Sequence, residues 1–245
     1  MTASPDDPMR FEILYPGDSP AIKIHLAQGQ SVFADSGAML ASSINIQVEG
    51  ALKNGVLGGL ARKFLRGETL FFQTLTALNA PGEVVMAPAP PGEVRVIELD
   101  GSMDWIIQKG AFLVASHGLQ METKTQNLLQ GIFSGEGFFV SRIKGVGTLA
   151  LNAFGSMHQV DLAAGEEYIV DNGHLVAWTA SAQYKITKAS RGWINTFISG
   201  EGFVCRFKGP GTILMQTRNP KAFGGWLSSY ISSRNGLDKP HERIF

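Results

Sequence analysis

Three related stretches recur along the 245-residue chain, and this repetition constrains its fold more than any other feature. Ser134–Phe138 (SGEGF) recurs downstream as Ser199–Phe203, and a weaker copy, Arg66–Phe71 (RGETLF), lies upstream at nearly the same separation. Each strong copy is followed by a lysine–glycine motif, which is KGVGT at Lys144–Thr148 and KGPGT at Lys208–Thr212. Self-similarity at a nearly constant spacing is the signature of a repeat architecture. We therefore predict three tandem units.

A second set of landmarks upstream of these motifs repeats with consistent offsets. Four positions of the first unit keep their mutual spacing in the second unit and again in the third. The matched positions are Ile24, Leu26, Gly37 and Leu40, then Ile97, Leu99, Gly110 and Leu113, then Val160, Leu162, Gly173 and Val176. We place the units at 10–88, 89–152 and 153–217, followed by a C-terminal helix and tail at 218–245. Units of this length are too long for ankyrin or leucine-rich repeats and suit a small β-sandwich.

The residue patterns within the units predict strands. Apolar residues recur with period two in Ala21–Leu26 and Tyr184–Thr187, which places them on one face of a strand. Phe112–Ala115 and Leu175–Trp178 are apolar throughout, which is typical of strands that are covered on both faces. The 29 glycines provide frequent turn signals between these runs. The expected fold class is therefore all-β, with three tandem β-sandwich repeats.

The repeated glycines and glutamates are expected to be structural. Glycines on either side of a charged residue permit a backbone bend that a side chain would obstruct. A feature present in every unit is needed to fold each unit, so we assign a structural role to Gly67, Glu68, Gly135, Glu136, Gly137, Gly200, Glu201 and Gly202. Catalysis by one of these glutamates is the weaker alternative. The two lysine–glycine motifs are expected to form tight turns that lead into strands.

Two segments depart from the β pattern and are candidate interaction surfaces. The stretch 54–66 is apolar, glycine-containing and basic, and it has no counterpart of equal length in the other units. Pro220–Ile231 has the pattern of a short amphipathic helix after a proline start. Contact with a neighbouring subunit or a membrane surface is one interpretation of each segment, and the favoured alternative is an ordinary helix packed on the core. The residues predicted to interact are Leu57, Leu60, Arg62, Lys63, Phe64 and Trp226.

Charge and cysteine content narrow the function classes. The formal net charge is zero, so no bulk electrostatic force favours nucleic acid or anionic membranes. The single cysteine, Cys205, lies in an apolar run and is expected to be a buried, inert thiol. Met1–Asp7 lacks the features of a signal peptide, and no apolar run reaches the ~20 residues that span a bilayer. We expect a cytoplasmic protein with peripheral membrane association.

The sequence lacks the motifs of common active sites and cofactor sites. Cupin metal sites need two histidines one residue apart, and no two histidines of this chain have that spacing. The five histidines are His25, His117, His158, His174 and His241. There is no Gly-x-Ser-x-Gly elbow, no phosphate-binding loop and no dinucleotide fingerprint. We therefore predict no catalytic residue, no metal and no cofactor.

Together, the ordered motifs resemble the altered-inheritance-of-mitochondria protein 24 family, a mitochondrial biogenesis family and former domain of unknown function. The resemblance rests on the Gly-Glu-Gly and Lys-Gly-x-Gly-Thr motifs and on Gly58–Arg66, and it covers 10–217. It implies three double-stranded β-helix sandwiches like that of the tryptophan RNA-binding attenuation protein, packed about a pseudo-threefold axis, and a homotrimer. Mitochondrial relatives are linked to inner-membrane organisation, and the motifs carry no catalytic assignment. The first unit departs from the pattern, because Thr69 replaces the second glycine.

These observations favour a non-enzymatic, homo-oligomeric scaffold or interaction protein that touches membranes or membrane complexes. The alternative is a small-ligand-binding protein or an enzyme with a site in or between the repeats. The third option is binding of RNA or tryptophan, which the fold kinship and the cations Arg142, Lys144, Arg206 and Lys208 favour. The neutral net charge disfavours it, so nucleic acid is not an expected partner.

Overall fold

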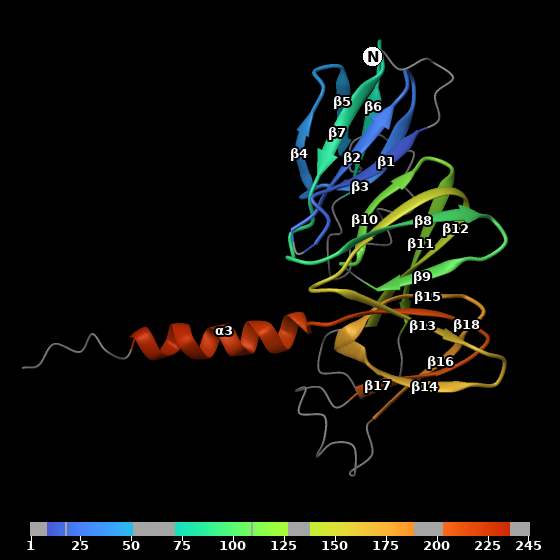
Figure 1. The fold of residues 1–245 in the computed structure, drawn as a ribbon, viewed down its shortest axis with the longest axis vertical. Helices are drawn as coiled ribbons and strands as arrows, with labels where there is room; N and C mark the ends of the chain where they lie inside the picture. Colours follow the sequence, from blue (N-terminus) through green and yellow to red (C-terminus); the bar gives the residue numbers. More distant parts are fainter. Residues whose placement is uncertain are drawn as a thin grey trace, which may run out of the picture.

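Antiparallel strands form most of this computed structural model, which describes residues 9–17, 19–50, 72–108, 110–126, 138–188 and 203–235. The strands fall into hydrogen-bonded sheets of four, eleven and three strands. A short 3₁₀ helix, η1 (Asn172–His174), and one α-helix, α3 (Pro220–Asn235), complete the described part of the chain. The sheets follow one another along the long axis, and α3 projects sideways from them (Figure 1). The predicted all-β fold is confirmed.

Two small sheets lie at opposite ends of the β-structure in Figure 1. Sheet 1 contains, in spatial order, β1 (Arg10–Leu14), β2 (Ala21–Leu26), β7 (Gly82–Met86) and β4 (Met39–Ser42). Sheet 4 contains β14 (Glu167–Asp171), β17 (Phe203–Lys208) and β16 (Gln183–Lys188). In β2 the side chains of Ile22 and Ile24 are buried, whereas those of Lys23 and His25 are partly exposed. The period-two pattern therefore predicted this strand correctly.

The eleven-stranded sheet consists of two sheets that share the 15-residue strand β12 (Phe138–Asn152). Sheet 2 contains, in order, β8 (Val94–Asp100), the second half of β12, β10 (Phe112–Ser116), β3 (Ser31–Asp35), β6 (Phe72–Ala77) and β5 (Ile46–Gly50). Sheet 3 contains β13 (Met157–Leu162), β18 (Gly211–Gln216), β15 (Leu175–Thr179), β9 (Trp105–Gln108), the first half of β12 and β11 (Leu119–Gln126).

A hydrophobic core lies between each pair of successive sheets. The first joins sheets 1 and 2 through residues such as Ile24 and Leu75, and the second joins sheets 2 and 3 through Leu149 and Val176. The third lies between sheets 3 and 4 and is lined by Trp178, Val170, Cys205, Phe207 and Ile213. The apolar runs at β10 and β15 are buried along their length because both of their faces meet a core.

The same pairing order occurs three times along the chain. The trios β2-β7-β4, β8-β12-β10 and β13-β18-β15 match one another, and so do β3-β6-β5, β9-β12-β11 and β14-β17-β16. A register shift falls at the equivalent place in each of the first three trios, at Met39/Ala41, Phe112/Val114 and Leu175/Ala177. Each predicted unit thus contributes one trio to each of two sheets. The unit boundaries and the pseudo-threefold arrangement stay predictions.

The first lysine–glycine motif does not form the tight turn that we expected. Lys144–Thr148 lies inside β12, which runs without interruption and passes there from sheet 3 to sheet 2. Gly145 has φ +111° and Gly147 has φ +151°, a region that favours glycine. A Cβ atom on Gly147 would lie 2.1 Å from Ser116 Oγ. The motif is therefore a bend within a strand, where a side chain would collide with β10.

Candidate functional site

Most of the residues singled out in the sequence lie outside the described part of the chain. This holds for the structural set Gly67, Glu68, Gly135, Glu136, Gly137, Gly200, Glu201 and Gly202, and for the interaction candidates Leu57, Leu60, Arg62, Lys63 and Phe64. Their predicted roles stay predictions. Trp226 is described, and it lies on α3.

The helix α3 carries an exposed apolar stripe. The side chains of Phe223, Trp226, Leu227, Tyr230 and Ile231 are all exposed, and Trp226 is 55% exposed. Their spacing of three and four residues places them on one face of the helix. The rings form a ladder, with centroids 5.6 Å apart for Phe223 and Trp226 and 5.0 Å apart for Trp226 and Tyr230. No other described element has as many exposed large apolar side chains.

The start of α3 is fixed to the β-structure. Asn219 Oδ1 accepts hydrogen bonds from the backbone N–H groups of Lys221 at 3.0 Å and Ala222 at 3.2 Å, which satisfies two donors of the first turn. Phe223 packs edge-on against Phe154, with ring centroids 5.1 Å apart. The remaining turns of the helix extend away from the sheets in Figure 1. The helix therefore has a defined origin and presents its apolar stripe to the surroundings.

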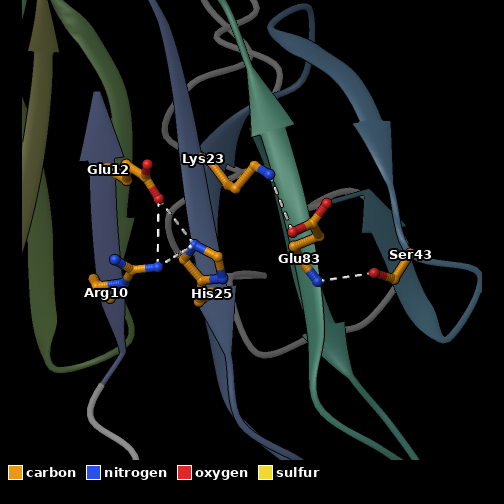
Figure 2. Close-up of polar contacts among 6 residues, drawn as sticks. All are labelled: Arg10, Glu12, Lys23, His25, Ser43 and Glu83. Carbon is orange, nitrogen blue, oxygen red and sulfur yellow. Dashed lines mark hydrogen bonds and ion pairs between the residues drawn. The ribbon is translucent and has the colours of Figure 1, made fainter. Parts of the chain in front are cut away.

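A polar network covers part of the outer face of sheet 1 (Figure 2). His25 Nε2 lies 2.9 Å from Arg10 Nη2 and 3.2 Å from Glu12 Oε2. Also from β2, Lys23 Nζ lies 3.3 Å from Glu83 Oε2 on the neighbouring strand β7. All of these side chains are partly exposed on an open strand surface, and none lines the hollow described below. The network pairs neighbouring strands across the outer face of the sheet.

A hollow of about 320 Å³ lies beside the loop between β1 and β2. Its lining is formed by Ile13, Pro16, Gly17, Pro20, Glu93, Val94 and Ser156. The Glu93 carboxylate accepts hydrogen bonds from Arg95 Nη2 at 2.8 Å and from the Met157 backbone N–H at 2.7 Å. Glu93 is thus committed to joining β8 with β13. The ligand-binding alternative stays a prediction, and this hollow is one place in the described structure where it can be tested.

Cys205 is fully buried in the third core. Burial, together with the negative charge of Asp171, raises the pKa of its thiol to about 12. A thiol with this pKa is almost entirely protonated at neutral pH and is a poor nucleophile. Within the described ranges, no group of three or more His, Cys, Asp or Glu side chains is placed to hold a metal ion.

Two cations of the RNA-binding option are engaged with carboxylates. Arg142 Nη2 lies 2.7 Å from Asp104 Oδ2, and Lys144 forms an ion pair with Glu122. These pairs neutralise the charges that a phosphate backbone would need. The ion pair of Lys144 with Glu122 follows from the pairing of β12 with β11. In this pairing Glu122 lies opposite Arg142, which is two positions from Lys144 along β12. Sequence spacing alone could not reveal it.

Comparisons with known proteins agree on one family. The family model described as mitochondrial biogenesis AIM24 matches residues 11–218. An uncharacterized protein of Streptococcus pyogenes serotype M6 is 32% identical over 234 residues, which cover 92% of each chain. A crystal structure of a Streptococcus pyogenes protein superposes with a TM-score of 0.76 at 32% identity, covering 91% of this chain and 100% of that one.

Fungal relatives bear the name altered inheritance of mitochondria protein 24, mitochondrial. The Aspergillus flavus protein is 26% identical over 204 residues, and the Talaromyces stipitatus protein is 22% identical over 245 residues. The matches span 50% and 58% of these relatives' own lengths. In the part of this chain that can be described, no helix is both long and apolar enough to cross a bilayer.

Proposed function

We propose a function from the premise that this chain belongs to the mitochondrial biogenesis AIM24 family: it is a non-enzymatic, oligomeric scaffold that attaches to a membrane surface through α3. The observation that carries this proposal is the apolar stripe of α3. Beyond Phe223, which packs on Phe154, the stripe is exposed in the described structure, and an exposed apolar face of this kind needs another apolar surface to cover it.

The composition of α3 favours a lipid surface as that cover. Trp226 and Tyr230 have an apolar body and a polar tip, which suits the boundary between headgroups and acyl chains. The opposite side of the helix carries small residues, including Gly225, Ser228 and Ser229, and Pro220–Asn235 contains no Asp or Glu. Helices of this kind lie in the interface with the apolar face buried. Since the chain has no net charge, apolar burial must supply the binding energy.

A vesicle flotation assay tests the proposal. The full chain is mixed with small and with large phosphatidylcholine vesicles, at low and at high salt. We expect it to float with the small vesicles, whose curved surface exposes more acyl chain, and high salt should not release it. Burial of one large apolar side chain contributes about 1.5–3 kcal/mol, so Trp226→Ser should weaken binding by roughly 10-fold or more.

A matched control lies on the same helix. Ser228→Ala changes the opposite side of α3, where the Ser228 hydroxyl donates to the Gly225 carbonyl at 2.9 Å, and it should leave flotation unchanged. Binding that requires anionic lipid and disappears in salt would contradict attachment by apolar burial. A chain that floats with no vesicle of any composition would contradict the membrane role and would leave a protein partner as the cover for α3.

The proposal also covers the absence of catalysis, the cellular location and the role of residues 54–66. The fully buried thiol and the engaged carboxylates support a non-enzymatic role. A cytoplasmic location at the membrane surface and the contribution of 54–66 belong to this proposal as well. The fungal relatives carry a mitochondrial name, and an organelle bounded by membranes is consistent with the membrane association proposed for this chain.

A further inference from the structure

The strand β4 differs from its two counterparts in having an open edge. In the alignment of the three units, which matches Leu40 with Leu113 and Val176, β4 corresponds to β10 and β15. The strand β10 pairs with β3, and β15 pairs with β9. The strand β4 pairs with β7, and no other described strand meets it. One of three equivalent junctions is thus open on this side.

The strand β14 has the complementary open edge. The same alignment makes β14 the counterpart of β3 and β9, which pair with β10 and β15. Of the strands that the structure describes, β14 pairs with β17 alone. Among the described strands, β5, β11 and β16 each have one neighbour in all three units, so these edges do not distinguish one unit from another.

Side-chain exposure marks the same junction. Leu40 in β4 is 63% exposed, whereas its counterparts Leu113 and Val176 are 0% exposed. All four residues of β4 are exposed, but β15 is buried along its whole length. An exposed leucine at a strand position that is buried in the other two units indicates a missing neighbour.

The two open edges belong to complementary half-sheets. Each unit has a first trio, equivalent to β2-β7-β4, and a second trio, equivalent to β3-β6-β5. Sheets 2 and 3 each combine the first trio of one unit with the second trio of the preceding unit. Sheet 1 has the first kind of trio, β2-β7-β4, and sheet 4 has the second, β14-β17-β16. The strands β4 and β14 lie at opposite ends of the β-structure, with sheets 2 and 3 between them (Figure 1). The two edges therefore do not pair with each other within the described chain, and a second copy of the chain offers each of them a complementary edge.

We propose that β4 of one copy pairs antiparallel with β14 of a second copy, head to tail, and completes a sheet of the same kind as sheets 2 and 3. The existing junction places Val114 opposite Ala34, and Ala41 and Val170 are the counterparts of these two residues. Ala41 then lies opposite Val170, and the next pair along the strands is Ser42 with Ile169. This proposal gives the oligomer of the proposed function its interface and does not depend on α3.

The pairing has consequences for assembly. Main-chain hydrogen bonds supply affinity when a strand is added to an open sheet edge, and the side chains set the register. A head-to-tail contact uses two different surfaces, so it repeats until the assembly closes on itself. Pairing would cover Leu40 on one copy and Ile169 on the other, both of which are accessible in the single chain.

Engineered cysteines test the register directly. Opposite residues in an antiparallel pair alternate between wide and close spacing, so Ala41→Cys/Val170→Cys and Ser42→Cys/Ile169→Cys sample both. Each cysteine is placed in a separate chain, and the two chains are mixed, unfolded and refolded together, then oxidised. We expect a disulfide-linked species of two chains from at least one pair. All chains carry Cys205→Ala, because Cys205 lies opposite Val170 on β17 and could otherwise link to a cysteine introduced there.

The control uses the same strands out of phase. Ser42→Cys mixed with Val170→Cys places the two thiols on opposite faces of the joined sheet, and roughly 10-fold less linked product, or lower still, is expected. Equal linking by this pair, or no linking by either in-phase pair, would overturn the register. Linking within a doubly substituted single chain, without links between chains, would overturn the assignment to a second copy.

A measurement of mass in solution needs no cysteine. The wild-type chain is expected to have a mass of several copies by light scattering, and Leu40→Lys should reduce it to one copy because a charged edge resists pairing. Val48→Lys is the matched control, since Val48 is also exposed but lies on the outer edge strand β5. A wild-type monomer, or equal loss with both variants, would refute the interface even if α3 binds vesicles.

Discussion

The hydroxyl oxygen of Ser116, at the end of β10, accepts a hydrogen bond from the backbone N–H of Thr148 in β12 at 2.9 Å. The same contact recurs in the other two units. Thr179 Oγ1 accepts from the Thr212 N–H at 2.9 Å, and Ser43 Oγ accepts from the Glu83 N–H at 2.9 Å. In each case the hydroxyl satisfies a backbone N–H close to the point where the chain passes from one sheet to the next.

Removal of one hydroxyl should therefore destabilise the fold without changing its shape. Thr179→Val keeps the side-chain volume but leaves the Thr212 N–H without its acceptor, which should lower the free energy of unfolding by about 1–3 kcal/mol. Urea denaturation measures the change. Ser102→Ala removes a hydroxyl from an exposed turn, and its effect should stay within about 0.5 kcal/mol. Equal effects from the two variants would contradict a role for the buried hydroxyl.

The bend at Gly147, next to Ser116, leads to a second prediction about stability. Gly147→Ala should destabilise the chain by more than about 2 kcal/mol, because the new Cβ would collide with Ser116 Oγ in addition to straining the backbone. Gly165 also has positive φ, at +80°, but a Cβ there would meet no atom within 4 Å. Gly165→Ala should show the backbone strain alone, about 1 kcal/mol. The difference between the two unfolding midpoints isolates the steric contact.

The sequence predicted the order of strands well, because their short-range patterns are local properties. The alignment of matched residues such as Leu40, Leu113 and Val176 even fixes which positions are equivalent across sheets. The sequence did not predict that each unit is divided between two sheets. That division depends on the pairing of β3 with β10 and of β9 with β15, which joins residues far apart in the chain. Patterns of alternation carry no information about such pairing.

The candidate surface was predictable to a similar degree. The spacing of Phe223, Trp226, Leu227, Tyr230 and Ile231 predicts an amphipathic helix, and α3 is present. Whether that stripe packs on the chain's own core is decided by the direction in which the helix leaves β18. Asn219 sets this direction, because it caps α3 and also lies against Gly173, where a Cβ would be 2.0 Å from Asn219 Nδ2. No local pattern identifies that contact.

The buried thiol of Cys205 makes a chemical prediction. Since its pKa is raised to about 12, roughly one thiol in 10,000 would be ionised at pH 8 even if it were accessible. A disulfide reagent should therefore label the native chain roughly 1,000-fold more slowly than the chain in concentrated urea, or more slowly still, because burial and ionisation act together. An added thiol at Ser102→Cys, in an exposed turn, should react rapidly in the native state. Rapid native labelling of Cys205 would contradict its burial.

The pH dependence of stability should reveal the environment of Asp35, at the end of β3. Burial raises the pKa of this carboxyl, and backbone N–H groups of Gly37 and Ser36 oppose the shift only in part. A raised pKa means that the folded chain holds the proton more tightly than the unfolded chain. The resulting stabilisation is complete below the ordinary pKa of 3.8 and is lost as the pH rises through the folded value. At pH 7 the ionised Asp35 therefore disfavours the fold.

Asp35→Asn removes this charge and keeps an oxygen that can accept the same two backbone hydrogen bonds. We expect the variant to melt at a higher temperature than the wild type at pH 7, and the difference should shrink as the pH falls towards 4. Asp100→Asn supplies the opposite sign, because the Ser102 hydroxyl and N–H lower the pKa of Asp100 and so favour its ionised form in the fold. Melting curves between pH 4 and 7 measure both effects. A pH-independent difference for Asp35→Asn would show that packing, and not the charge, distinguishes the two side chains.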